Sequence, residues 1–332
     1  MKLIIQIPCF NEAESLPTAL NDLPREVDGF DKVEWLVIDD GSTDNTVDVA
    51  KDHKVDYIIQ HTKNQGLAKS FMTGIDACLN LGADVIVNTD ADNQYNPKDI
   101  VKLVQPILNG KADIVVGARP IDTVKHFTFI KKVLQKVGSW VVRVVSKTDI
   151  PDAPSGFRAI SREAALHLNV FNDYTYTLET IIQVGKKNMA IMSVPIRVNE
   201  YLRPSRLLRS TPSYIKQSIV TIVRIFVVYK PFRFFMSIGV SMFALGFLIG
   251  LRFLGYYVLG KGQGHIQSLI LASVFMGIGF QTMLVAFVAD LLAVNRRLVE
   301  DIQYRMRKIE AKKQSISIRN NSERVYGLIK SG

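Results

Sequence analysis

The sequence predicts an α/β domain, built on a mostly parallel sheet with helices on both faces, followed by a hairpin of two transmembrane helices. Three observations lead to this prediction. Short β-branched apolar runs alternate with helix-like stretches up to about residue 200, polar and acidic residues follow these runs, and two long uncharged apolar segments lie further along the chain. Hydrophobic residues make up 48% of the 332 residues, which excludes a disordered chain.

Five apolar runs are expected to form strands, and the stretches between them are expected to form helices. The strand runs are residues 2–7, 33–38, 55–60, 84–89 and 113–117. The helical stretches are residues 12–22, 44–52, 66–81 and 97–108. Asn96 and Pro97 are typical of an N-cap and a first helical residue. Strands this apolar are typical of parallel sheets buried on both faces. The first run is too short for a signal peptide, so we expect the domain to stay in the cytosol.

The charge balance and the cysteines narrow the classes of function. The net charge of +10 suits anionic lipid, a phosphorylated ligand or nucleic acid, and it does not choose among them. Cys9 and Cys78 are the two cysteines, and both lie in apolar surroundings without a CxxC motif or a histidine cluster. A disulfide framework and a zinc site are therefore not expected.

Polar residues follow four of the predicted strands. They include Glu12 after the first strand, Asp40 after the second, Asp90 and Asp92 after the fourth, and Arg119 after the fifth. The carboxyl ends of parallel strands meet at one edge of the sheet, where ligands bind in such folds. Each group alone has a structural explanation, because residues 39–44 suit a turn and a helix N-cap and residues 90–92 suit a loop. Gathered carboxylates repel one another unless a cation neutralises them, so the pattern predicts a cation site.

The Asp90-Ala91-Asp92 segment suits a divalent metal. Mg²⁺ or Mn²⁺ prefers oxygen ligands and keeps positions open for substrate phosphates. Gln94 is expected to add an amide oxygen or to position a water. The expected partner is a nucleoside diphosphate. A GxGxxG motif is absent, and the Walker-like residues 255–262 lack the final Ser/Thr and lie between the two apolar segments.

Five motifs in this order carry a family resemblance: Ile-Pro-Cys-Phe-Asn-Glu (7–12), Ile-Asp-Asp-Gly-Ser-Thr-Asp (38–44), Asp-Ala-Asp (90–92), Gly-Ala-Arg (117–119) and Ser-Gly-Phe-Arg (155–158). The chain resembles the family 2 inverting glycosyltransferases with a GT-A fold. Among them it is most similar to the polyprenyl-phosphate glycosyltransferases, the group of dolichol-phosphate mannose synthase and bacterial undecaprenyl-phosphate glucosyltransferases. The resemblance implies an enzyme that moves one hexose-type sugar from a nucleoside-diphosphate sugar to a polyprenyl phosphate with Mg²⁺ or Mn²⁺.

The resemblance also implies roles for individual residues. The base and ribose would be held by Pro8, Phe10, Glu12, Ile38 and Asp40. The metal and diphosphate would be held by Asp90, Ala91, Asp92 and Gln94. Arg119 would lie near the phosphates and the acceptor, and we take Asp92, Arg119 and Asp152 as the catalytic candidates.

The sequence departs from the family's pattern at two places. Relatives often carry Arg-x-x-Gly-x-Ser-Lys where this chain has Arg203 and Arg206, which we predict to neutralise the diphosphate, with a solvated basic stretch as the alternative. Gly156 stands where some relatives carry an aspartate proposed as a base. Asp152, Asp149 or no base would then serve, because a lipid phosphate is already largely ionised near pH 7.

Residues 234–251 and 266–289 carry no charge and are long enough to span a membrane, with a buried soluble hairpin as the alternative. Basic residues are frequent on both flanks, whereas the connecting loop has only Lys261 and His265. The positive-inside rule then predicts a multi-pass protein of the inner or plasma membrane with both termini cytoplasmic. The expected domains are 1–210 (catalytic), 211–231 (amphipathic juxtamembrane helix), 232–292 (transmembrane hairpin) and 293–332 (basic cytosolic tail).

Lipid contact is expected at two amphipathic stretches, residues 214–229 and 126–147. The second is either a helix packed on the sheet or an acceptor helix whose Lys131 or Lys132 meets the lipid phosphate. Ser155 and Arg158 are further candidates for holding that phosphate.

Two other functions compete with the single-sugar transferase. A processive polysaccharide synthase would share the fold, but the Gln-x-x-Arg-Trp motif and the additional spans of that class are not found. A non-catalytic membrane adaptor that binds partners or nucleic acid would leave the acidic strand ends unexplained. We therefore expect no nucleic-acid partner, while the sugar and a homo-oligomeric state stay open.

Overall fold

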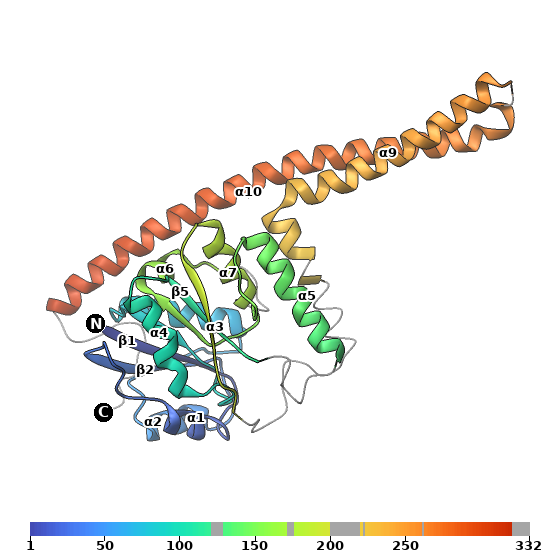
Figure 1. The fold of residues 1–332 in the computed structure, drawn as a ribbon. Helices are drawn as coiled ribbons and strands as arrows, with labels where there is room; N and C mark the ends of the chain where they lie inside the picture. Colours follow the sequence, from blue (N-terminus) through green and yellow to red (C-terminus); the bar gives the residue numbers. More distant parts are fainter. Residues whose placement is uncertain (121–128, 171–175, 200–219, 222, 261, 321–332) are drawn as a thin grey trace. The chain divides into compact units, whose positions relative to one another are not determined.

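The computed structural model describes residues 1–120, 129–170, 176–199, 220–221, 223–260 and 262–320, without the side chains of 129–135, 262–263 and 311–320 (Figure 1). The chain divides into two compact units. The first, here the catalytic unit, comprises Met1–Ile215 together with the chain from Ile302 onward, and the second, here the helical unit, is Lys216–Asp301. Each unit is described by itself.

The catalytic unit is built on a seven-stranded sheet with the order β3-β2-β1-β4-β6-β5-β7. The strands are β1 (Lys2–Cys9), β2 (Lys32–Asp39), β3 (Tyr57–Gln60), β4 (Val85–Asn88), β5 (Ile114–Ala118), β6 (Arg158–Ser161) and β7 (Ile191–Pro195). Only β6 runs against its neighbours β4 and β5, and the other pairs are parallel. The mostly parallel sheet and all five expected strands are thus confirmed, with boundaries shifted by one or two residues. The short strands β6 and β7 were not expected, because neither has a long apolar run.

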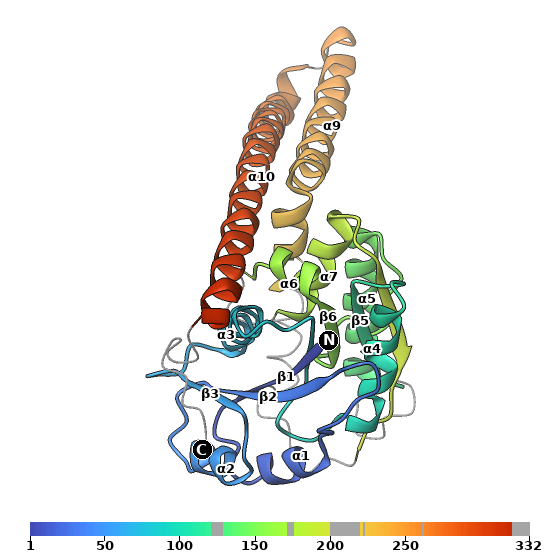
Figure 2. The ribbon, with the colours of Figure 1, turned by 90° about the vertical axis from the view of Figure 1, so that its left-hand side faces the viewer.

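Helices cover both faces of this sheet. They are α1 (Leu16–Asp22), α2 (Thr46–Asp52), α3 (Leu67–Asn80), a 3-10 turn η1 (Pro97–Asp99), α4 (Ile100–Leu108), α5 (Phe129–Ser146), α6 (Arg162–His167) and α7 (Thr177–Lys186). In Figures 1 and 2, α1 and α2 lie on one side of β1 and β2, and α3 lies on the other side. The side chain of Asn96 accepts a hydrogen bond from the N–H of Lys98 (3.1 Å), as expected for the N-cap.

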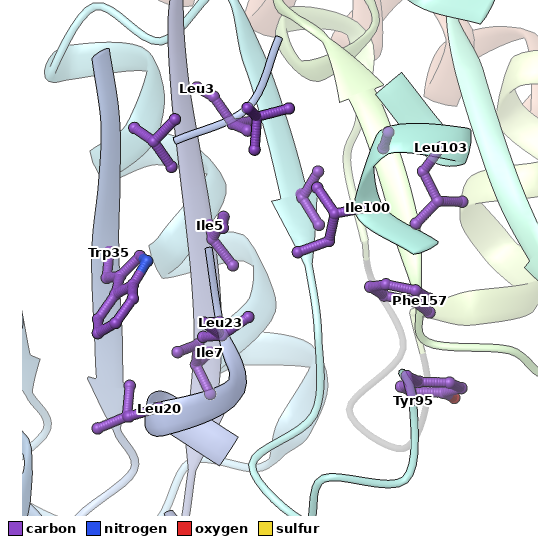
Figure 3. Close-up of a cluster of buried hydrophobic side chains, with 14 of the residues drawn as sticks. Leu3, Ile5, Ile7, Leu20, Leu23, Trp35, Tyr95, Ile100, Leu103 and Phe157 are labelled. Atoms are coloured by element: carbon purple, nitrogen blue, oxygen red, sulfur yellow. The ribbon is translucent and has the colours of Figure 1, made fainter. Parts of the chain in front are cut away.

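The core follows from the alternation of side chains along the strands. Leu3, Ile5 and Ile7 point to one face of β1 and pack with Leu20 of α1 and Leu103 of α4 (Figure 3). On the opposite face α3 approaches closely. A Cβ added to Gly74 would lie 2.5 Å from Oε1 of Gln6 and 2.8 Å from Cδ1 of Ile38, so only glycine fits there.

The helical unit contains one long apolar helix and the first part of a second, which continues into the catalytic unit from Ile302 onward. α9 (Pro231–Val258) and α10 (Ile266–Asn320) are joined through the short η2 (Gly262–His265), and both helices are long and apolar enough to cross a membrane. Their backbones touch at glycines, since a Cβ on Gly239 would lie 2.9 Å from the carbonyl oxygen of Gly279. Most side chains of the two apolar windows are not buried by protein, as expected of helices surrounded by lipid rather than of a soluble core. Most of the expected juxtamembrane helix lies outside the described residues, but 223–229 are helical.

Candidate active site

The polar strand ends do meet at one edge of the sheet. Cys9 at the end of β1 is in register with Asp39 at the end of β2, and Gln6 of β1 is in register with Asn88 at the end of β4. Burial of the Cys9 thiol raises its pKa well above the usual value, and the negative charges of Glu12, Asp39, Asp44 and Asp90 raise it further. The Cys9 thiol is therefore close enough to carboxylates from the ends of three strands for their charges to affect its pKa.

The loops that follow β1 and β2 are tied to each other. The N–H of Asn11, a residue with φ of 54°, donates to Oγ of Ser42 (2.8 Å), and the N–H of Glu12 donates to Oγ1 of Thr46 (2.9 Å). The Glu12 carboxylate is nearly buried and accepts a hydrogen bond from the Ser15 hydroxyl. Phe10 directly precedes these anchored residues after β1 and is 40% exposed.

Asp40 holds the loop that follows β3. Its carboxylate accepts hydrogen bonds from the N–H groups of Gln65 (2.9 Å) and Gly66 (2.8 Å). His61 lies 2.7 Å away through Nδ1, while its Nε2 is 3.2 Å from Oγ1 of Thr73. His61 was missed in the sequence, although it directly follows a strand and the rule used for the other strand ends would have found it.

Asp90 and Asp92 form a carboxylate pair after β4. Burial raises the pKa of Asp90 to about 7, and the charges of Asp92 and Glu12 add to this effect, whereas Arg119 and a hydrogen bond from Tyr95 oppose it. Asp92 is half-buried and accepts a hydrogen bond from the N–H of Gln94 (3.1 Å). Two carboxylates that repel each other in a partly buried place form a site that a cation would stabilise.

A divalent metal fits this pair with help from a substrate. Among the residues that the structure describes, no group of three or more His, Cys, Asp or Glu side chains is arranged to hold a metal ion. Mg²⁺ is commonly bound by one or two carboxylates together with substrate phosphates, so Asp90 and Asp92 suit such an ion. Gln94 as a further ligand stays a prediction.

Arg119 is fixed by Asp152. Its Nε and Nη2 donate to the two carboxylate oxygens at 2.7 and 3.0 Å, and its own N–H donates to Oδ2 at 3.1 Å. Asp152 is fully buried, so this bidentate pair is shielded from water and geometrically defined. The carboxylate of Asp152 is engaged in orienting the arginine.

Gly156 lies against the carboxylate pair. A Cβ at this position would lie 3.1 Å from both carboxylate oxygens of Asp90 and 3.0 Å from the Tyr176 hydroxyl. The carbonyl of Gly156 accepts from Nδ2 of Asn88 (2.9 Å), and its N–H donates to the Tyr95 hydroxyl (3.0 Å). An aspartate here would place a further carboxylate next to Asp90. Asn88, Tyr95 and Tyr176 were not singled out from the sequence.

Ser155 and Arg158 lie in the interior rather than at the surface. Arg158 donates to the carbonyls of Ser155 and Ala153, both at 2.8 Å, and to the Thr180 hydroxyl, and burial lowers its pKa to about 10. Ser155 is fully buried as well. In this structure the guanidinium hydrogen-bonds the 153–155 loop, and the contact of Ser155 and Arg158 with a lipid phosphate stays a prediction.

The other predicted site residues either lie outside the described part of the chain or are buried near the edge of the sheet. Arg203 and Arg206, and the side chains of Lys131 and Lys132, lie outside the described residues. Pro8 and Ala91 are buried at the edge, and the side chain of Ile38 faces α3 rather than the edge.

Comparison with known proteins agrees with this geometry. Residues 4–168 match the family described as Glycosyl transferase family 2. A UDP-N-acetylglucosamine–dolichyl-phosphate N-acetylglucosaminyltransferase of Methanococcus voltae is 30% identical over 217 residues, covering 58% of this chain and 83% of that protein. An undecaprenyl-phosphate mannosyltransferase of Micrococcus luteus is 28% identical over 207 residues, covering 59% of this chain and 83% of that protein.

Solved structures share the fold. A glucosyl-3-phosphoglycerate synthase from Mycobacterium tuberculosis, crystallised with Mn²⁺, uridine diphosphate and phosphoglyceric acid, has a TM-score of 0.52 at 18% identity, covering 67% of this chain and 78% of that one. A structure of the same enzyme with phosphoglyceric acid has a TM-score of 0.53 at 19% identity, covering 68% and 79%. The matched family, the relatives and the fold agree: this chain belongs to glycosyl transferase family 2 and is a glycosyltransferase with a GT-A fold.

Proposed function

We propose that this enzyme transfers one hexose-type sugar from a nucleoside-diphosphate sugar to a polyprenyl phosphate at a membrane surface. The observation that carries the proposal is the gathering of acids from three strand ends around Cys9, beside an arginine held by a buried carboxylate, in a chain that also has two apolar helices of membrane-spanning length. The relatives that act on dolichyl or undecaprenyl phosphate support the choice of acceptor.

The donor binds at the acidic edge. Phe10 and Glu12 face the base and ribose, and Pro8 and Asp40 shape that part of the edge. Asp90 and Asp92 would hold a divalent ion, which would supply positive charge to the departing diphosphate. Arg203 and Arg206 add positive charge to the same phosphates.

Arg119 stabilises charge that develops during transfer. Its bidentate pair with Asp152 fixes the guanidinium before the substrate arrives, so little reorganisation is needed at the moment of reaction. Asp152 acts as a positioning residue rather than as a base. A lipid phosphate that is already ionised attacks the anomeric carbon in line, the bond to the diphosphate breaks, and the configuration of the sugar inverts.

The acceptor reaches the site along α5. Val137, Trp140 and Val144 follow one another at helical spacing and are exposed, with Trp140 at 56%, whereas Val141, Val142 and Val145 are buried on the other side of the helix. Trp side chains suit the membrane interface because they join an apolar body to a polar tip. This face contacts lipid, and Lys131 and Lys132 in the first turns of α5 meet the phosphate. Both ends of the chain are cytoplasmic in this proposal.

The test is incorporation of label into lipid. Membranes containing the enzyme are incubated with a panel of radiolabelled sugar nucleotides, undecaprenyl phosphate and Mg²⁺ or Mn²⁺, and the lipid is extracted. We expect one sugar per lipid from one donor, and reduced labelling by a Trp140→Glu variant without loss of donor binding. Label in a polymer would instead support the processive synthase, and no labelled lipid from any donor would contradict the proposal.

A further inference from the structure

The final part of α10, from Ile302 onward, belongs to the catalytic unit and contacts other helices of that unit through one face. The Tyr304 hydroxyl donates to Oε1 of Glu163 (2.8 Å), and its ring stacks on His167 at 3.8 Å between centroids. Arg307 pairs with Asp76 on α3 (3.1 Å) and also donates to the carbonyl of Leu168. This segment lies within the basic cytosolic tail expected over 293–332, and it packs on α3 and α6.

Another face of the same helical segment is apolar and exposed. Val299, Ile302, Met306 and Ile309 are each between 49% and 57% exposed. Their spacing of three, four and three residues is that of the a and d positions of a coiled coil, in which an apolar seam repeats every seven residues. They follow Arg296 and Arg297, beyond the uncharged part of the helix.

The same spacing extends back along α10. The preceding a and d positions hold Val285, Val288, Leu292 and Asn295, and all four are exposed as well. Seven of these eight seam positions are apolar, while Tyr304 and Arg307, which contact α6 and α3, stand at f and b positions outside the seam. The seam thus lacks a partner in the described part of this chain.

We propose that this seam, α10 residues 285–309, pairs with the same seam of a second copy as a parallel two-stranded coiled coil. In a parallel pair, a g position of one helix lies beside the e position five residues later on the other. Arg305 is a g residue and Glu310 is the following e residue, so the two-fold axis creates this attractive pair twice.

The membrane sets the relative direction of the two α10 helices, and one polar seam residue sets their register. Two copies inserted with the same topology into one membrane run in the same direction, which permits the parallel arrangement. Asn295 is a single polar residue within an otherwise apolar seam, and such a residue fixes register because out-of-register pairing would bury its amide against apolar side chains.

Cysteine cross-linking of the full-length protein in membranes tests the seam. Cys9 and Cys78 are buried, so they leave little background. We expect Ile302→Cys and Met306→Cys variants to give a disulfide-linked dimer on mild oxidation. The matched control, Lys308→Cys, lies in an exposed position on a different side of the same turns and is expected to stay monomeric. Equal cross-linking at all three positions, or none at 302 and 306, would overturn the proposal.

A charge exchange tests the register and separates a second copy from a lipid surface. In the Ile302→Cys background, Arg305→Glu and Glu310→Arg each place like charges together, and we expect cross-linking to fall about threefold or more. The double exchange restores the opposite-charge pair and is expected to return cross-linking to its starting level. If the double variant is no better than the single ones, the partner is not a parallel second copy.

Discussion

The acidic edge of the sheet and the α9–α10 hairpin satisfy their polar groups in opposite ways. At the edge, partners are distant in sequence: Arg119 binds Asp152, 33 residues away, and Asn88 donates to Tyr176, 88 residues away. In the hairpin, the hydroxyls of Ser241 and Thr282 donate to carbonyls four residues earlier in their own helix. The edge therefore depends on the whole fold, whereas each membrane helix satisfies its backbone and hydroxyls locally.

The largest decrease in the rate of sugar transfer is expected when a predicted metal ligand at the edge of the sheet is removed. Asp92→Asn leaves one carboxylate at the site, and we expect transfer to lipid to fall by about 10²–10³-fold. The measurement is the initial rate of lipid labelling at saturating Mn²⁺. Asp48→Asn is the matched control, because Asp48 is an exposed aspartate on α2. Full activity of the Asp92 variant would reject its assigned role.

A substitution at the buried ion pair tests whether Asp152 positions Arg119 or accepts a proton. Asp152→Asn leaves Arg119 without its charged partner, and we expect the rate to fall by about 10–100-fold, since one partner of a buried pair then lacks compensation. The pH–rate profile is expected to keep its shape, because Asp152 does not accept a proton in the proposed mechanism. Loss of the acidic limb of that profile would make Asp152 the base instead.

The close contact between α9 and α10 can be tested by replacing one glycine at the contact, with a glycine outside the contact as the control. Gly239→Leu places a side chain where a Cβ already lies 2.9 Å from the backbone of α10, so we expect the helices to separate and the melting temperature of the solubilised protein to fall by several degrees. A Cβ added at Gly277 would have no atom within 4 Å, so Gly277→Leu is expected to change little. Similar melting temperatures for the two variants would argue against the observed packing.

The smallest effect concerns a structural ion pair away from the site. Asp99 accepts hydrogen bonds from Arg197 and pairs with Lys102, and although burial opposes the shift, these contacts lower its pKa to about 2. Because the pKa is lowered from 3.8, the stabilisation is fully present above about pH 4 and is lost as the pH falls through about 2. Asp99→Asn should therefore lower the melting temperature at pH 7 by a few degrees, and the difference from the parent protein should shrink between pH 4 and pH 2. A difference independent of pH would contradict the role of charge.

The sequence predicted the strands well because their signal is local. Each of the first five strands is a short apolar run bounded by polar residues, and their parallel arrangement implied that Glu12, Asp40 and Asp90 would approach one another. The roles of single polar residues were harder to predict. Arg158 stands in a motif that resembles a functional one, yet only the packing of β6 and α7 shows that its guanidinium is buried.

The amino-acid sequence by itself determined the fold class, the membrane-spanning length of both apolar segments and the residue types at the sheet edge. All three depend on local composition and spacing along the chain. The folded structure was needed to show that Asp152 holds Arg119, that Gly156 leaves room for Asp90, and that Tyr304 of α10 contacts α6. These contacts join segments that are far apart in sequence, and such pairings are set by the packing of the whole domain rather than by any local pattern.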